Sequence, residues 1–364
     1  MGLARRILPK LRYPLLGLAA VILAVSVPIV RNEVYCQGAR KDVAPFRSVL
    51  EPAYRRDEVN SYLTYPEWAI VHAYEDLAGV TRRGSESDFA YFDSVGSFWS
   101  SLCGITRLAS SRGTVSLEYK VMLYTIGVSF AAEMGLKGLY ERTVGRVTTW
   151  IRGPRPTPED EFALAVAEDY AAFLRQTPWY EYPFGSKLVQ FWTNTRVTLR
   201  NPIRSLERRI SLSLEYGVKA IYARLIGFGA GAAPAPIRIR SVIRGLQASD
   251  LAGDPSITLI GILEDGSSVI ETPRYRAFTN ILRKLAERGR DAVEIAGNDD
   301  ILITILARGD APTNLAGTKQ LFSLGVQSRP GWRRIGLDAK VPAVLGVIRA
   351  IDPTNAELEH VYDY

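Results

Sequence analysis

Two charged motifs at helical spacing are the parts of this sequence most suited to chemistry. Each has a glutamate, a lysine four residues later and a tyrosine three residues after that: Glu133, Lys137 and Tyr140, then Glu215, Lys219 and Tyr222. On a helix, a glutamate and a lysine in this order attract each other. In the apolar sequence around Glu133, such a pair needs partners from a neighbour or a ligand. We expect the motifs to lock two helices together; the alternative is a cleft with two carboxylates for acid–base catalysis.

His72 is the next candidate, in a chain that has two histidines. Glu75 and Asp76 follow it by three and four residues, so a helix would hold two carboxylates beside the imidazole. This pattern is typical of an ion pair on a helix surface, and a role as a ligand or general acid is the alternative. The second histidine, His360, alternates with apolar residues, which predicts the exposed face of a last strand.

Sequence motifs for cofactors and metals give no support to either. The chain contains no GxSxG, Walker loop, HExxH or CxxC. Gly227, Gly229 and Gly231 lack both the spacing and the preceding strand of a nucleotide-binding fingerprint. No Cys/His spacing suggests zinc. The sequence therefore predicts neither a metal nor a cofactor.

The two charged motifs belong to a longer internal similarity. Seven identical residues link residues 128–145 to residues 210–227. Further matches upstream share one constant offset: Thr64 with Thr157, Glu75-Asp76 with Glu168-Asp169, and Phe98-Trp99 with Phe191-Trp192. We interpret residues 64–233 as a helical domain made of a duplicated unit, 64–150 and 157–230.

Two features of the first unit predict where its helices lie. Thr64 and Glu67 form a predicted capping box at the start of the first helix. Residues 121–139 are apolar enough to suggest a membrane span, but the matching helix at 203–227 carries seven charged residues, which are costly in lipid. We therefore expect residues 121–139 to form a buried helix, with a membrane hairpin as the alternative.

The last third of the chain alternates short strand patterns with one clear helix. Strand patterns occur at 257–263, 268–271, 292–296 and 301–307, and a helix pattern runs from Thr272-Pro273 to Gly289. This order predicts an α+β domain over 256–364 with a helix covering an antiparallel sheet, preceded by a linker at 234–255. The expected fold class is therefore a mainly α body followed by an α+β domain.

The N-terminal segment has the pattern of a membrane anchor. Arg5, Arg6, Lys10 and Arg12 precede an uncharged run, and residues 14–30 are long enough to enter a bilayer as one transmembrane helix. A cleaved signal peptide is the alternative for residues 1–31, because small residues flank Val25. The positive flank predicts a single-pass protein of the bacterial inner (cytoplasmic) membrane with its body on the periplasmic side. Residues 32–63 are an expected linker.

The chain has two cysteines, Cys36 and Cys103. In an oxidising compartment they could form a disulfide. Cys103 follows Phe98-Trp99 in an apolar helix pattern where a small buried thiol fits well. We therefore favour two unpaired thiols, and the disulfide is the alternative.

Charge and composition narrow the function. The formal net charge is +7, and five positive charges with no acid lie in residues 1–31. A folded nucleic-acid interface needs that charge on the body, so nucleic-acid binding is not expected. The aromatic segment Trp179–Phe184 is of a kind used at interfaces. We expect a membrane-anchored envelope protein that binds another envelope component, or alternatively an enzyme that uses the carboxylates of the helical repeat on a lipid or other amphiphile.

Overall fold

The computed structural model describes residue 23 and residues 26–40, 46–196, 200–229, 238–309, 311 and 315–364. Most of the expected anchor, residues 14–30, lies outside these residues; of it, residues 23 and 26–30 are described as helical. Within the part of the chain that is described, no helix is long and apolar enough to cross a membrane.

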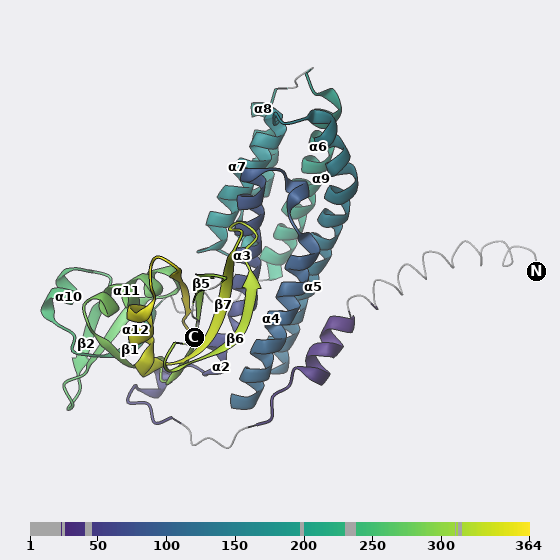
Figure 1. The fold of residues 1–364 in the computed structure, drawn as a ribbon. Coiled ribbons are helices and arrows are strands. Elements are labelled where there is room, and N and C mark those ends of the chain that lie inside the picture. The colour runs from purple at the N-terminus through teal and green to yellow at the C-terminus, as the bar shows by residue number, and fades with distance from the viewer. Residues whose placement is uncertain are drawn as a thin grey trace, which may run out of the picture.

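A bundle of long helices forms the N-terminal body (Figure 1). Its helices are α2 (Val59–Leu63), α3 (Tyr65–Arg83), α4 (Tyr91–Arg112), α5 (Leu117–Tyr140), α6 (Arg146–Arg152), α7 (Pro158–Leu174), α8 (Phe184–Asn194) and α9 (Pro202–Gly229). A π-helical turn, Glu141–Gly145, joins α5 to α6. The mainly α body that the sequence predicts is therefore confirmed.

The residues matched in the sequence repeat fall on corresponding helices. The matches place α3 with α7, α4 with α8, and α5 with α9. Helix α3 packs against α7, and α5 is bonded to α9 through their side chains. Two helices of the first unit thus meet the helices that the sequence matches to them.

A helix begins after Thr64 as predicted, but the predicted capping box of Thr64 and Glu67 is wrong. Helix α2 runs almost directly into α3, and the Thr64 hydroxyl donates back to the Asn60 carbonyl at 2.7 Å instead of capping α3. The capping box occurs at the matched position, where Thr157 accepts from the Asp160 amide and the Asp160 carboxylate accepts from the Thr157 amide. Thr64 lacks this role because the preceding turn is already helical.

The C-terminal part contains two four-stranded antiparallel sheets. The first unit comprises β1 (Arg238–Arg244), α10 (Ala248–Ala252), β2 (Thr258–Ile262), β3 (Ser268–Pro273), α11 (Tyr275–Glu287) and β4 (Asp291–Ile295). The second comprises β5 (Asp300–Arg308), β6 (Thr318–Gly325), β7 (Trp332–Lys340), α12 (Val341–Ala350) and β8 (Ala356–Tyr362). The expected α+β class is confirmed, but β1 and α10 occupy the expected linker at 234–255, and two sheets replace the single sheet.

The two sheets have the same topology. Their strand orders are β2-β3-β1-β4 and β6-β7-β5-β8, so each unit follows the path strand, strand, strand, helix, strand, with the short helix α10 added after the first strand of the first unit. Even the irregularities correspond: registers shift between β2 and β3 and between β6 and β7, and again between β1 and β4 and between β5 and β8. Because β-bulges are specific features of a fold, their recurrence indicates a duplicated βββαβ unit.

The second sheet shares a core with the helical body. Tyr62 and Tyr65 pack with Phe322 and Tyr362, and the ring centroids of Tyr65 and Phe322 lie 4.5 Å apart. Tyr62 also donates to Asp338 of β7 at 2.7 Å. The expected linker at 32–63 therefore contains residues of this joint core, and the helical and α+β parts are fixed to each other.

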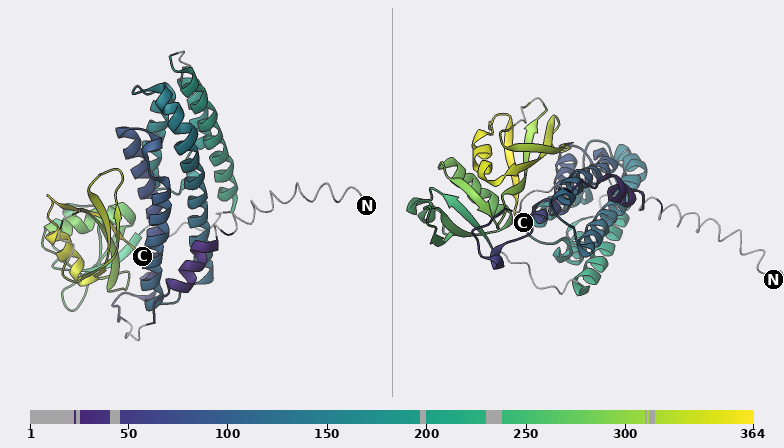
Figure 2. Two further views of the ribbon diagram at one scale, coloured as in Figure 1. Left: turned by 45° about the vertical axis from the view of Figure 1, so that its right-hand side comes forward. Right: turned by 90° about the horizontal axis from the view of Figure 1, so that it is seen from below.

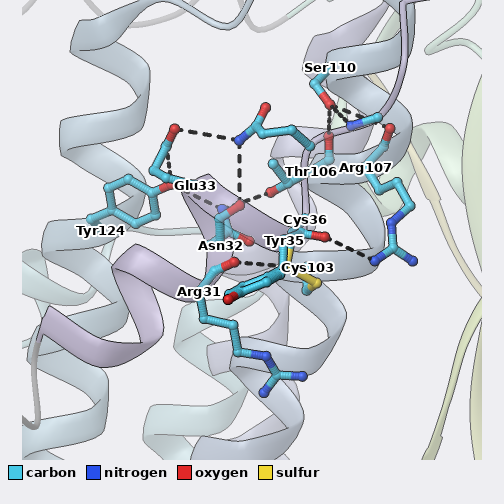
Figure 3. Close-up of a disulfide and its surroundings, with 12 residues drawn as sticks. Arg31, Asn32, Glu33, Tyr35, Cys36, Cys103, Thr106, Arg107, Ser110 and Tyr124 are labelled. Atoms are coloured by element: carbon cyan, nitrogen blue, oxygen red, sulfur yellow. Dashed lines mark hydrogen bonds between the residues drawn. A yellow bond between two sulfur atoms is a disulfide. The ribbon is translucent and has the colours of Figure 1, made fainter.

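A disulfide between Cys36 and Cys103 fastens the segment that leads out of the expected anchor (Figure 3). Residues 26–35 are helical and lie against α4 and α5. Asn32 donates to Thr106 at 3.2 Å and to Tyr124 at 3.0 Å, while Glu33 pairs with Lys120 at 2.8 Å. The favoured prediction of free thiols is wrong because these polar contacts bring Cys36 onto the helix face that carries Cys103.

Removal of the disulfide should destabilise the body. We expect the Cys36→Ser/Cys103→Ser variant to lose about 2–4 kcal/mol of unfolding free energy, since 67 residues separate the cysteines and the unfolded chain regains their freedom. Urea unfolding in detergent would measure the loss. Thiol titration of the denatured, unreduced protein is the check, and two reactive thiols per chain would contradict the disulfide.

Candidate functional site

The six residues of the charged motifs meet at the interface of α5 and α9. Lys219 bridges Glu133 at 2.7 Å and Glu215 at 3.0 Å, and Lys137 binds Glu215 at 3.1 Å. The two tyrosines complete the row: Tyr140 donates to Glu207, and Tyr222 stacks on Trp179 with ring centroids 5.1 Å apart. Glu133 thus pairs across the interface with the lysine of the other motif.

A second layer of charges lies beneath this row, and the sequence did not reveal it. Arg208, which is almost fully buried, binds Glu86 at 2.9 Å and Glu141 at 2.7 Å. Arg204, equally buried, binds Asp160 at 2.8 Å and Glu207 at 2.7 Å. Of these ion pairs, sequence spacing could have predicted only Arg204–Glu207, because the other carboxylates come from segments far away in the sequence.

The α5–α9 interface has the character of a structural lock. Each lysine and glutamate of the two motifs is bonded within the interface, and none of these four residues lines the large cleft between the helical body and the α+β domain.

The prediction that residues 121–139 are buried is wrong in part. Only the face with Leu123, Phe130 and Met134 is buried, while Leu136 and Leu139 are exposed.

Removing the buried arginine should be far more costly than removing an outer charge. We expect Arg208→Ala to lose about 3–5 kcal/mol of unfolding free energy, because Glu86 and Glu141 remain buried without their cation. Glu133→Gln is the matched control; its side chain is 37% exposed, so we expect a loss of about 1 kcal/mol or less. Thermal and urea unfolding would measure both, and equal losses would contradict the two-layer description.

A cleft of about 980 Å³ lies where the helical body meets the α+β domain. Trp68 and His72 of α3 line one side, and Arg175 of α7 continues it. Helix α11 and strand β8 supply the opposite side, the latter through Glu359 and His360. The cleft therefore depends on elements from both parts of the chain.

His72 lies inside this cleft rather than on a solvated helix surface. Its Nδ1 is 3.2 Å from Glu75, and its Nε2 is 3.7 Å from Glu359 and 3.5 Å from the Tyr362 hydroxyl. Burial alone would raise the pKa of Glu75, but His72 and Arg175 lower it to about 2. The expected neighbour Asp76 instead accepts from the Gln327 and Ser328 amides.

His360 is buried, so the predicted exposed position is wrong. It packs on Trp68, with ring centroids 3.9 Å apart, because β8 turns this side of the second sheet toward α3. Its Nδ1 lies 3.2 Å from the Thr279 hydroxyl, which already accepts from the Val361 amide at 3.0 Å. We assign the hydroxyl proton of Thr279 to a bond with Nδ1, which leaves the imidazole proton on Nε2.

The Nε2 atom of His360 has no hydrogen-bond partner among the described residues. Burial, together with repulsion by His72 and by Arg276, lowers the pKa of His360 to about 3, so the ring is neutral at pH 7. A buried N–H group without an acceptor costs about 1–3 kcal/mol. With the proton assigned to Nε2, the lining of the cleft thus contains a hydrogen-bond donor that no described residue satisfies.

Two cations of the cleft also lack a carboxylate. Four lining arginines are paired with lining acids: Arg82 with Glu168, Arg175 with Glu75, Arg329 with Glu357 and Arg334 with Glu359. Over the ranges that the structure describes, no carboxylate pairs with Arg276 or Arg283 of α11. Arg283 donates to the Leu358 carbonyl at 3.1 Å. These two guanidinium groups and the His360 N–H face the same cleft.

No group of three or more potential metal ligands occurs among the described residues, so the structure offers no evident metal centre there. Comparisons with protein families, with curated proteins and with solved structures find no match.

The buried neutral histidine should make stability depend on pH. Because the pKa of His360 is lowered in the folded state, the unfolded chain binds the additional proton, and stability is lost as pH falls below 6.5. We expect a loss of about 2 kcal/mol between pH 6.5 and 4.5 from this group. Urea unfolding of wild type and His360→Asn at several pH values would measure it; an unchanged pH slope in the variant would be evidence against it.

Proposed function

We propose that this protein is a membrane-anchored envelope protein whose body is a binding module, and that the cleft takes a small molecule with a carboxylate or phosphate group. Residues 14–30 hold it in the cytoplasmic membrane, and the disulfide favours an oxidising compartment for the body. The observation that carries the proposal is the unpartnered Nε2 of His360 in a cleft that Arg276 and Arg283 also line. An oxyanion would accept from all three donors.

The duplicated sheets give independent support. The position of β4 that corresponds to His360 is Glu294, since each pairs with the central strand just before the register shift. Glu294 is buried and accepts from Ser48 Oγ at 2.9 Å and from the Val49 and Leu50 amides at 3.1 Å. In the first unit this position therefore binds a segment of the chain itself, whereas in the second unit it is a buried histidine in the lining of the cleft.

Catalysis is the second candidate, and one observation favours it. The imidazole of His72 is oriented by Glu75 on one side and lies near Glu359 and Tyr362 on the other. A histidine held in this way is suited to acid–base chemistry on a bound ligand. The version that uses Glu133 and Glu215 on an amphiphile has less support, because Lys219 binds both carboxylates and neither lines the cleft.

Anion binding can be tested on the imidazole signals. The chain has two histidines, so NMR of the imidazole N–H groups in detergent gives signals that a His72→Gln variant assigns. We expect titration with inorganic phosphate or acetate to shift the His360 Nε2–H signal. Arg276→Gln should weaken this binding about tenfold, because a charge-assisted hydrogen bond is lost.

The matched control is Arg244→Gln, which removes an exposed positive charge from β1, outside the cleft. We expect this variant to bind phosphate or acetate as the wild type does. A His360 signal that does not shift on titration would refute the cleft as the binding site. Equal affinity for phosphate or acetate in the Arg276→Gln and Arg244→Gln variants would refute it too.

A further inference from the structure

Helix α9 exposes a continuous row of apolar side chains. The row comprises Ile203, Leu206, Ile210, Leu214, Val218, Ile221 and Leu225, each 54–67% exposed. The spacing of three or four residues places them on one face. Soluble proteins rarely expose an apolar surface of this extent, so the row marks a contact with something that is not water.

Neighbouring helices extend the same surface. On α5, Val121, Leu136 and Leu139 are exposed, and on α6 Trp150 is 82% exposed. The exposed positions from Ile203 to Tyr222 carry no charge, and the one partly exposed charge between Val121 and Leu139, Glu133, is paired with Lys219. We call the exposed side of α5, α6 and α9 the apolar wall.

The wall is apolar because the charges of α5 and α9 point at each other or inward. Lys137, Glu215 and Lys219 lie in the interface between the two helices, while Arg204 and Arg208 lie buried behind it. Each helix thus turns its polar side to protein. This is the reverse of a helix pair that faces water on its outer side.

The placement of the wall points to its occupant. Strand β6 of the second sheet packs against α4. Helix α5 packs against α4 from the other side (Figure 2). The α+β domain therefore does not obstruct the wall. Residues 26–35, which lead out of the expected anchor, are fastened to Lys120 and Tyr124 near the beginning of α5. The anchor thus joins the body beside the wall.

We propose that the apolar wall lies on the same bilayer that holds the anchor, with α5 and α9 in the plane of the membrane and their exposed side chains in the outer part of the hydrocarbon. This inference rests on the proposed function for the anchor and goes beyond it, because the body itself then contacts lipid. Exposed Arg31, Arg146 and Arg224 near its margins would face anionic headgroups.

An interface with a second copy is the competing explanation for the wall. A protein interface that forms from water-soluble partners ordinarily has a polar rim and about one hydrogen bond per 100–200 Å² to fix its register. The stretch from Ile203 to Tyr222 offers no exposed charge for that purpose, and the three arginines at its margins have the same sign, so they would repel one another across a symmetric interface. Lipid needs no register, so the bilayer fits the observation better.

Fluorophores on single cysteines would test the inference in full-length protein. Because Cys36 and Cys103 are bonded, an introduced cysteine is the only free thiol. Ile210→Cys and Ile221→Cys lie on the wall about 16 Å apart along the helix axis. Ser249→Cys, exposed on α10, is the matched control. Each labelled protein would be placed in phosphatidylglycerol/phosphatidylcholine vesicles with spin-labelled lipid.

We expect both wall labels to be quenched at least twofold more by a spin label at lipid carbon 5 than by one at carbon 12, and the control label by neither. Labels at clearly different depths would mean that α9 crosses the bilayer, and would overturn the in-plane arrangement. Wall labels that stay exposed to water would also overturn the inference. So would wall labels that are protected from water only in chains cross-linked to a second copy. Flotation with the vesicles tests the anchor separately, so failure of the anchor is distinguishable from failure of the wall.

Discussion

The mutual neutralisation of charges between α5 and α9 is the constraint on which the helical body depends. Arg204 and Arg208 are buried with carboxylates from four separate segments, and Lys137 and Lys219 bind carboxylates of the facing helix. A buried charge that loses its partner is costly, so these pairs fix how the helices face one another. They also explain why the outer surface of α5 and α9 is apolar: the charged side chains of these helices lie in the interface between them or are buried behind it.

The cleft has a different origin, since it exists only where two parts of the chain are joined. Helix α3 contributes Trp68 and His72, and the second βββαβ unit contributes Glu359 and His360. The aromatic packing of Tyr65 with Phe322 and Tyr362 fixes the position of the two sides of the cleft relative to each other. The first βββαβ unit uses the matching position, Glu294, for a contact with residues 48–50, whereas the second unit has His360 there, in the lining of the cleft.

The two duplications differ in how visible they are. The helical one is an interpretation of the sequence, in which the same charged residues recur at the same spacing on α5 and α9, and these residues bind one another. The βββαβ one is evident in strand order and register, while its sequence matches were not found. A strand needs only alternating apolar residues to pack, so topology persists where residue identity does not.

The sequence by itself determined the class of each region, the long helices, the apolar N-terminal run and the helical spacing of the two charged motifs, since all follow from local periodicity. Only the tertiary structure decided that Cys36 meets Cys103, that His360 is buried against Trp68, and that α5 is apolar on its exposed side. The reason is physical: each of these outcomes depends on which distant segment covers a residue. Spacing along one chain specifies a face, but the neighbour that meets that face belongs to the fold.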